Sequence, residues 1–462
     1  MSHPRFPNGE TFTKYGWGVC LWVLITAFQY GYHISALNQI QAVLTCNDTT
    51  SDVYRRYGLP TCIPMSDFTF SLVTSIFTVG GLTGSLVANL VMDKHGRKGA
   101  TKICAVTMAA GTGLMGVSSS VGFLALGRFL VGISSGVGLC VGPVFLGEIA
   151  PSKISGNVGV LTQLAIVLGI MLTQVAGLRL STPTEWRIVL LISFALAVIQ
   201  FIASAFATES PSWLASKGRL EENKSISVKL WGEVGINPSS RDVEDPLLDE
   251  AEERRRDVHQ DAVTIPQLFV ARDLRKPLMI VCLAMLSQQL SGINAVLYYS
   301  NAILSRSLPD LGPYVSLGIT IVNVIMTFPP ILLIERMGRR SLLTLSTFGS
   351  LFSLFAIGIG LDSGLVLLSS IATLTFVTSF AVGLGPIPFV MISEVSPPHA
   401  VSVLSSVALS LNWIANFCVG LAFLPLRNIL SGGDPLKEGR VFYVFVALLF
   451  TSTFLLSRYY RG

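Results

Sequence analysis

Apolar segments long enough to cross a lipid bilayer recur along almost the whole chain of 462 residues. A bilayer core about 30 Å thick is crossed by roughly 20 apolar residues in a helix. Because lipid offers the backbone no hydrogen-bond partners, such segments must be helical. We therefore predict an all-α membrane protein with twelve transmembrane helices, at about 16–37, 68–92, 100–121, 123–146, 157–178, 187–207, 277–304, 313–334, 342–361, 364–392, 400–424 and 440–456.

The charge content agrees with a membrane protein and argues against other classes. Only 13% of the residues are charged, about half of the share in soluble proteins, and 51% are hydrophobic. The net charge of +5 comes from basic residues in short loops, so we expect a lipid bilayer and no nucleic acid as partner. The spans contain no cluster of His, Asp and Glu and no nucleophile–base pattern. We therefore expect no metal, no cofactor and no enzymatic activity.

The stretch from residue 208 to 276 differs from the rest, because its charges are dense and no part is long enough to span a bilayer. We interpret it as a cytoplasmic linker with short helices. Basic residues after the second and eighth segments mark the cytoplasmic side, and an even number of spans places both termini there. The predicted division is a cytoplasmic N-terminus at 1–15, a six-helix half at 16–207, the linker at 208–276, a second six-helix half at 277–458 and a short cytoplasmic tail at 459–462.

Two loop motifs occur twice, at nearly the same offset in each half. The run DKHGRK at 93–98 follows the second segment, and ERMGRR at 335–340 follows the eighth. The run GEIAP at 147–151 ends the fourth segment, and SEVSP at 393–397 ends the tenth. This repetition indicates two six-helix pseudo-repeats with the same orientation.

Three carboxamides lie within seven residues of the seventh segment. Gln288, Gln289 and Asn294 would each be costly to turn toward lipid, so they must face protein, water or a ligand. On a straight helix Asn294 lies roughly 140° around from Gln289, so all three reach one cavity only if the helix loosens at Ser291-Gly292. Neutral amides beside a broken helix suit a neutral polyhydroxyl ligand. The alternative is that these amides hold one helix to another.

The loop from residue 38 to 67 is expected to face the outside. It contains Asn47-Asp48-Thr49, a sequence that accepts N-linked glycans, so we predict a glycoprotein modified at Asn47. Cys46 and Cys62 lie in the same loop, where a disulfide between them is an open alternative to two free thiols.

Several specific motifs follow one another in a characteristic order. They are QQLSGINAVLYYS at 288–300, GPIP at 385–388 and GRF at 127–129, together with the repeated loop motifs. With them the chain resembles the sugar porters of the major facilitator superfamily over essentially its whole length. The resemblance is greatest to the facilitative hexose carriers, and we expect a fungal member.

This resemblance implies a sugar held between the two halves at mid-membrane by amides and aromatic rings. The matching positions are Gln163, Gln288, Gln289, Asn294, Asn323, Phe389, Asn412 and Trp413. Packing in the protein core is the alternative for Trp413. The resemblance also implies a cytoplasmic gate of charged residues that pair across helices when the carrier is open to the outside. The gate residues are Asp93, Arg97, Arg128, Glu148, Glu335, Arg339 and Glu394.

The chain departs from the family pattern at both the predicted gate and the predicted sugar site. Three arginines that are usual in the family are missing, at Ser155, at Ser212 and in the run 397–401. We therefore predict a weaker gate. At the sugar site, Phe389 stands where a tryptophan is usual and lacks the indole N–H donor, and Ala381 stands where an acidic residue is often found.

His33 bears most directly on the mechanism. The family has Asp at this position in proton-coupled members and usually Asn in uniporters. A histidine can hydrogen-bond as Asn does, and it also titrates near physiological pH, so His33 is a candidate proton site. Because no carboxylate is present at this position, we favour facilitated diffusion of a hexose or related monosaccharide by alternating access.

Two other functions stay open at this point. One is proton-coupled sugar symport through His33, and the other is a sugar sensor that does not transport, which the missing arginines suggest. A channel is disfavoured because no filter-like element is repeated. We expect one chain to suffice for transport. The glycosylation sequence fits the plasma membrane and a vacuolar or endosomal membrane equally well.

Overall fold

The computed structural model describes residues 11–46, 55–56, 58–232, 263–297, 314–432, 434 and 437–460. These residues are helical apart from connecting turns and one small hairpin, β1 (Arg55–Arg56) with β2 (Leu59–Pro60). They include eleven helical stretches that are long and apolar enough to cross a membrane. One of them, α3 (Asp67–Gly116), is two helices joined at Gly96, where φ is 76° and ψ is 179°. The described residues thus supply twelve membrane-crossing segments, as predicted.

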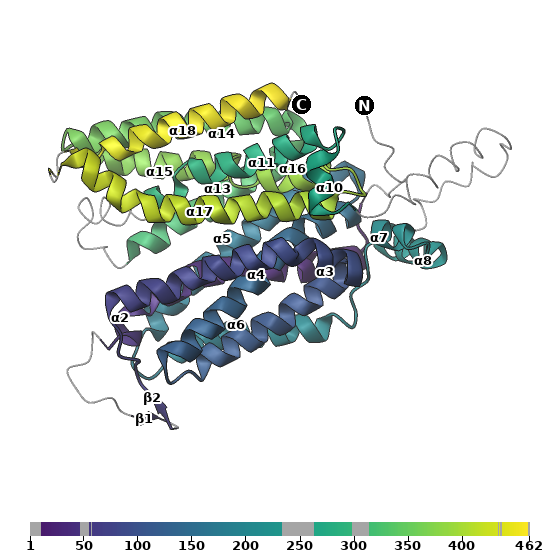
Figure 1. Ribbon diagram of the computed structural model, residues 1–462, viewed down its shortest axis with the longest axis horizontal. Helices are drawn as coiled ribbons and strands as arrows, with labels where there is room; N and C mark the ends of the chain where they lie inside the picture. Colours follow the sequence, from purple (N-terminus) through teal and green to yellow (C-terminus); the bar gives the residue numbers. More distant parts are fainter. Residues whose placement is uncertain are drawn as a thin grey trace.

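The helices fall into two groups that follow the sequence. The first group is α1 (Lys14–Gln39), α2 (Gln41–Leu44), α3, α4 (Val121–Ile149), α5 (Ser155–Leu180) and α6 (Trp186–Ala203). Between the groups lie α7 (Pro211–Ser216), α8 (Leu220–Trp231) and α10 (Ile265–Val270). The second group is α11 (Arg275–Leu290), α13 (Val315–Met337), α14 (Arg339–Asp362), α15 (Val366–Val382), α16 (Ile387–Val395), α17 (Val401–Ser431) and α18 (Arg440–Tyr459). Figure 1 shows the two groups as two layers, with both chain ends and α7 and α8 at one end of the molecule.

The predicted tenth segment differs from the observed one. We expected a continuous span over 364–392, but α15 ends at Val382 and α16 begins at Ile387. The four residues between them read Gly-Leu-Gly-Pro, and Pro386 has no N–H to donate to a helix. The backbone carbonyl groups of Leu384 and Gly385 are consequently available to side chains of other helices.

The first loop is fastened at two places. Cys46 and Cys62 form a disulfide, so the structure favours that alternative over free thiols. The indole N–H of Trp186, at the start of α6, donates to the carbonyl of Thr61 at 2.6 Å. Asn47 lies outside the described residues.

The two groups of helices meet along a seam that is narrow enough for direct side-chain contacts. Helix α17 packs against α3 and α4, α13 packs against α5, and α16 packs against α4 and α5. Hydroxyl groups bond across this seam: Ser85 lies 2.9 Å from Ser410, and Ser405 donates to the carbonyl of Cys140 at 3.0 Å. Residues of both predicted sites lie on these helices, among them Gln163 on α5, Asn412 on α17 and Glu148 on α4. Gln288 and Gln289 lie on α11, which packs against α17.

Candidate functional site

Helix α11 is interrupted at the two residues that the amide spacing indicated. The helix ends at Leu290, Ser291 and Gly292 form a turn, and the chain becomes helical again at Ile293. Gly292 has φ 72°, and a Cβ atom there would lie 2.8 Å from the ring of Phe445. Both the backbone angle and the space therefore favour glycine at this position.

The interruption lets four amides form one hydrogen-bonded chain, which we call the amide chain. Asn294 Nδ2 donates to Gln289 Oε1 at 3.1 Å, and Gln289 Nε2 donates to Asn412 Oδ1 at 3.2 Å. Asn412 Nδ2 donates to Gln288 Oε1 at 3.1 Å, and Gln288 Nε2 donates to the carbonyl of Gly385 at 2.8 Å. Four of the predicted sugar contacts, from α11, α17 and the helical segment after the turn at Ser291-Gly292, thus form one connected group.

Two further predicted amides approach from helices on either side of the seam. Gln163, on α5, lies beside the far end of the amide chain, because a Cβ atom on Gly385 would be 3.3 Å from its Cδ. Asn323, on α13, is 8% exposed, and its amide oxygen has no hydrogen-bond partner among the described residues. An unpaired acceptor is costly in a membrane interior, and Asn323 Oδ1 can accept a hydrogen bond that no described residue supplies.

Aromatic rings of the first half pack against Trp413, which follows Asn412 on α17. The ring of Trp413 lies edge-to-face with Tyr30 at 5.7 Å and with Phe77 at 5.6 Å. Trp413 is 2% exposed, and its indole N–H has no acceptor among the residues that the structure describes. Core packing therefore accounts for the ring but not for the N–H. Phe389 is buried near the start of α16.

His33 lies inside the first half, where it faces α6. Its Nε2 is 2.8 Å from the hydroxyl of Ser193, and its backbone carbonyl accepts a 2.8 Å hydrogen bond from Arg128. The guanidinium of Arg128 lies 4.4 Å from the centre of the Phe77 ring. Arg128, which the resemblance grouped with the gate, thus lies with His33 in the interior of the first half.

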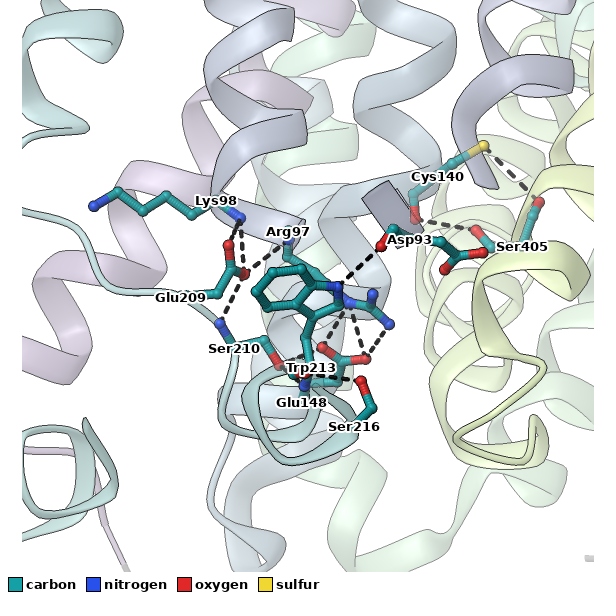
Figure 2. Close-up of polar contacts among 10 residues, drawn as sticks. All are labelled: Asp93, Arg97, Lys98, Cys140, Glu148, Glu209, Ser210, Trp213, Ser216 and Ser405. Atoms are coloured by element: carbon teal, nitrogen blue, oxygen red, sulfur yellow. Dashed lines mark hydrogen bonds and ion pairs between the residues drawn. The ribbon is translucent and has the colours of Figure 1, made fainter. Parts of the chain in front are cut away.

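One cluster of gate residues joins α3, α4 and the first part of the linker (Figure 2). Arg97 is 4% exposed and donates to Glu148 from Nη2 at 2.7 Å and from Nε at 2.9 and 3.1 Å. The hydroxyl of Ser210 also donates to Glu148. Glu209 accepts from the backbone N–H groups of Arg97 at 2.8 Å and Lys98 at 3.0 Å. Burial raises the pKa of the Glu209 carboxyl above its ordinary value, and these N–H groups act against that rise.

A second cluster joins α13, α14 and α16. Arg339 binds Glu394 at 2.6 Å and Glu335 at 2.8 Å. Glu335 also accepts a 2.7 Å hydrogen bond from the backbone N–H of Gly156, in the first turn of α5. A helix N-terminus favours a carboxylate, because its first N–H groups have no partners within the helix. The amino end of α5 thus supplies a donor next to Ser155, where the family usually has an arginine.

Each of these ion pairs joins residues of a single half. The contacts between the halves at this end include the bond from Gly156 to Glu335, a side-chain hydrogen bond between Asp93 and Ser402 of α17, and close packing of α4 on α16. A Cβ atom on Gly147 would lie 2.3 Å from the Cβ of Ser393. Asp93 contributes its backbone carbonyl, which accepts from the indole N–H of Trp213 at 3.4 Å.

Sequence reasoning missed three features of this end: the Gly156 N–H, the hydroxyl of Ser210 and the contact of Gly147 with Ser393. Gly147 begins the motif GEIAP and Ser393 begins the motif SEVSP, so these repeated motifs could have indicated the contact between the two residues. Backbone donors leave no signal of this kind, since every residue except proline carries an N–H.

Comparisons with known proteins identify the family to which the chain belongs. The family described as sugar (and other) transporter matches residues 19–458. The chain is 34% identical over 453 residues to the facilitated glucose transporter member 3 of solute carrier family 2 from Ovis aries, covering 95% of this chain and 88% of that one. It is 33% identical over 438 residues to a probable metabolite transport protein of Saccharomyces cerevisiae, covering 91% and 87%.

A solved structure supports the fold. The proton:xylose symporter XylE bound to 6-bromo-6-deoxy-D-glucose has a TM-score of 0.79 with this chain at 19% identity, covering 96% of this chain and 95% of that one. The family match spans almost the whole sequence, and its members are transporters rather than enzymes. The chain belongs to the sugar transporter family of the major facilitator superfamily and is an integral, multi-pass membrane protein.

Proposed function

We propose that this protein carries a hexose or a related monosaccharide by facilitated diffusion, through alternating access of a site between its two halves. The amide chain at the seam carries this proposal. Each amide offers both donors and acceptors, so sugar hydroxyls can replace amide–amide bonds without leaving a buried polar group unpaired. Asn323 Oδ1 and the Trp413 N–H add one acceptor and one donor that have no partners among the described residues.

The surroundings of His33 support uniport over proton coupling. His33 is fully buried, and Arg128 bonds its backbone carbonyl. A protonated His33 would therefore be a second buried cation beside this guanidinium. Among the described residues, no carboxylate bonds to either group, and burying such charges without a counter-charge is costly. A neutral His33 that bonds Ser193 can serve in place of the asparagine of uniporters.

We further propose that the two charged clusters keep each half rigid, and that opening toward the termini breaks only the contacts between halves. Because three arginines that are usual in the family are missing from this end, we expect the gate to be weaker than in other members. We place both termini and the gate in the cytoplasm, on the basis of the basic loops. The membrane would be the plasma membrane or a vacuolar or endosomal one.

Replacing Gln288 by Ala should weaken sugar binding, because this side chain links Asn412 to the Gly385 carbonyl. Losing one buried hydrogen-bonding group costs roughly 1–3 kcal/mol, so KM should rise about tenfold. The measurement is uptake of radiolabelled hexoses by purified protein in liposomes. Gln29→Ala removes a buried amide that faces Gln200 within the first half, and it should leave KM near the wild-type value. Equal KM changes in the two variants would refute a sugar site at the amide chain.

Facilitated diffusion predicts that an inward proton gradient changes neither the rate nor the final level of uptake. His33→Asn should then retain uptake, since Asn can bond Ser193 as a neutral histidine does. Liposomes loaded with a pH-sensitive dye report proton movement during the same assay. Accumulation of sugar above equilibrium that is lost in His33→Asn would instead establish proton symport. Sugar binding without uptake would favour the sensor.

The packing of Gly147 on Ser393 predicts that Gly147→Ala loosens the closed arrangement, because the added methyl group overlaps Ser393. A cysteine in place of Val390, which is 2% exposed on α16, should react several-fold faster with a water-soluble maleimide applied from the cytoplasmic side. Gly122→Ala, on the same helix with nothing within 4 Å of the new Cβ, is the matched control. Identical labelling rates in the two variants would show that this packing does not hold the halves together.

A further inference from the structure

The interruption between α15 and α16 lies against one end of the amide chain. Gln288 Nε2 donates to the carbonyl of Gly385 at 2.8 Å and lies 3.3 Å from that of Leu384. Gln288 in turn accepts a hydrogen bond from Asn412. The segment 383–386, which we call the span-ten break, therefore supplies the backbone acceptors that hold Gln288 in place.

A broken helix leaves backbone groups that need partners from elsewhere. In a continuing α-helix the N–H of Gly383 would bond the carbonyl of Ser379, and the N–H of Leu384 would bond the next carbonyl along. Instead, the N–H groups of Gly383 and Gly385 both donate to the carbonyl of Phe380, at 3.3 and 2.9 Å. The break thus deprives the Ser379 carbonyl and the Leu384 N–H of their helical partners.

One hydroxyl group, that of Ser346 on α14, pairs with both of these backbone groups. Ser346 Oγ donates to the Ser379 carbonyl at 2.6 Å and accepts from the Leu384 N–H at 2.8 Å. A hydroxyl can do both because it offers one donor and two acceptor lone pairs. Ser346 is 1% exposed, so these two bonds are shielded from water.

The backbone of α14 also lies close against the span-ten break. A Cβ atom on Gly383 would lie 2.6 Å from the carbonyl oxygen of Leu342 and 2.6 Å from the Cβ of Ser346. Nearby, a Cβ atom on Gly349 would lie 2.9 Å from the Cβ of Ser379. Glycine at these two positions lets α14 and α15 approach closely, and this approach brings the Ser346 hydroxyl to the break.

The first pseudo-repeat provides an internal comparison. Gly142-Pro143 in α4 corresponds to Gly385-Pro386, yet α4 continues through this step as one helix. Counted from the repeated loop motif, the residue that corresponds to Ser346 is Cys104. A thiol is a weak donor and a weak acceptor. The hydroxyl is therefore present in the half whose span is broken and absent from the half whose span is continuous.

We propose that Ser346 is a positioning residue for the sugar site, which fixes the span-ten break so that the Gly385 carbonyl meets Gln288. The hydrogen bonds of Ser346 go to Ser379 and Leu384 and to no amide of the amide chain among the described residues. Ser346 therefore acts through the backbone of the break. This inference rests on the sugar site proposed above, and it adds α14 to the helices that determine sugar affinity.

The test is the KM for sugar uptake into liposomes by Ser346→Ala, with Ser353→Ala as the matched control. Ser353 is also 1% exposed on α14, but its hydroxyl donates within its own helix, to the carbonyl of Gly349 at 2.7 Å. Ser346→Ala should raise KM roughly fivefold, because Gln288 loses the fixed position of its acceptor. The turnover number should stay near the wild-type value, as expected when uniform binding is lost. Ser353→Ala should leave both quantities unchanged.

Two further readouts separate positioning from a general loss of stability. In a Gln288→Ala background, Ser346→Ala should not raise KM further, because its effect passes through Gln288. Backbone hydrogen exchange in the peptide that contains residues 383–385 should be faster in Ser346→Ala than in Ser353→Ala, because the Leu384 N–H has lost its partner. Ser346→Cys keeps a weaker hydrogen-bonding group and should change KM and exchange in the same direction by less.

The inference is overturned by equal KM values in Ser346→Ala and Ser353→Ala, by an increase that adds in full to that of Gln288→Ala, or by unchanged hydrogen exchange. A raised KM in Gln288→Ala beside an unchanged KM in Ser346→Ala overturns this inference and leaves the sugar site standing. An unchanged KM in Gln288→Ala overturns both. If Ser346→Ala does not elute as monodisperse protein in detergent, Ser346→Cys takes its place in every comparison.

Discussion

The cost of leaving a polar group unpaired in a low-dielectric interior determines how the helices of this protein meet. Asn412 bonds both Gln288 and Gln289, so it ties α17 to α11. The Arg97–Glu148 pair ties the second arm of α3 to α4 in the same way. Two of the buried polar atoms that stay unpaired among the described residues, Asn323 Oδ1 and the indole N–H of Trp413, belong to helices that form the seam between the halves. They are among the groups on which the proposed sugar site rests.

The membrane spans and the break at Gly292 could be predicted because both depend on local properties. Hydropathy over about twenty residues determines a span, and three amides within seven residues can share one cavity only if their helix is interrupted. The division of the tenth span could not be found in this way, since residues 383–386 are flanked by apolar residues on both sides. The family resemblance grouped Asn412 with the amides of α11, and the structure brings their side chains into hydrogen-bonding contact. Their separation in sequence gives no physical reason to expect this contact.

The remaining predictions were limited because the sequence does not show how each helix is rotated about its axis. His33 could have faced either the seam or the interior of the first half, and only packing against α6 decides that it meets Ser193. The same uncertainty applied to Arg128, whose position in a motif suggested the gate. The sequence indicated that the predicted gate carboxylates would accept hydrogen bonds, but it did not show which residues would donate them. The donor to Glu335 from the other half, for example, is a backbone N–H.

That backbone donor bears on how such carriers diverge. An N–H is present whichever side chain its residue carries, proline excepted, so the bond from Gly156 to Glu335 survives most changes at Ser155 that keep α5 helical. An arginine can therefore be absent at this point while Glu335 still receives a hydrogen bond from the other half. The number of charged residues counted in an alignment is then a poor guide to whether a distant relative still moves its cargo.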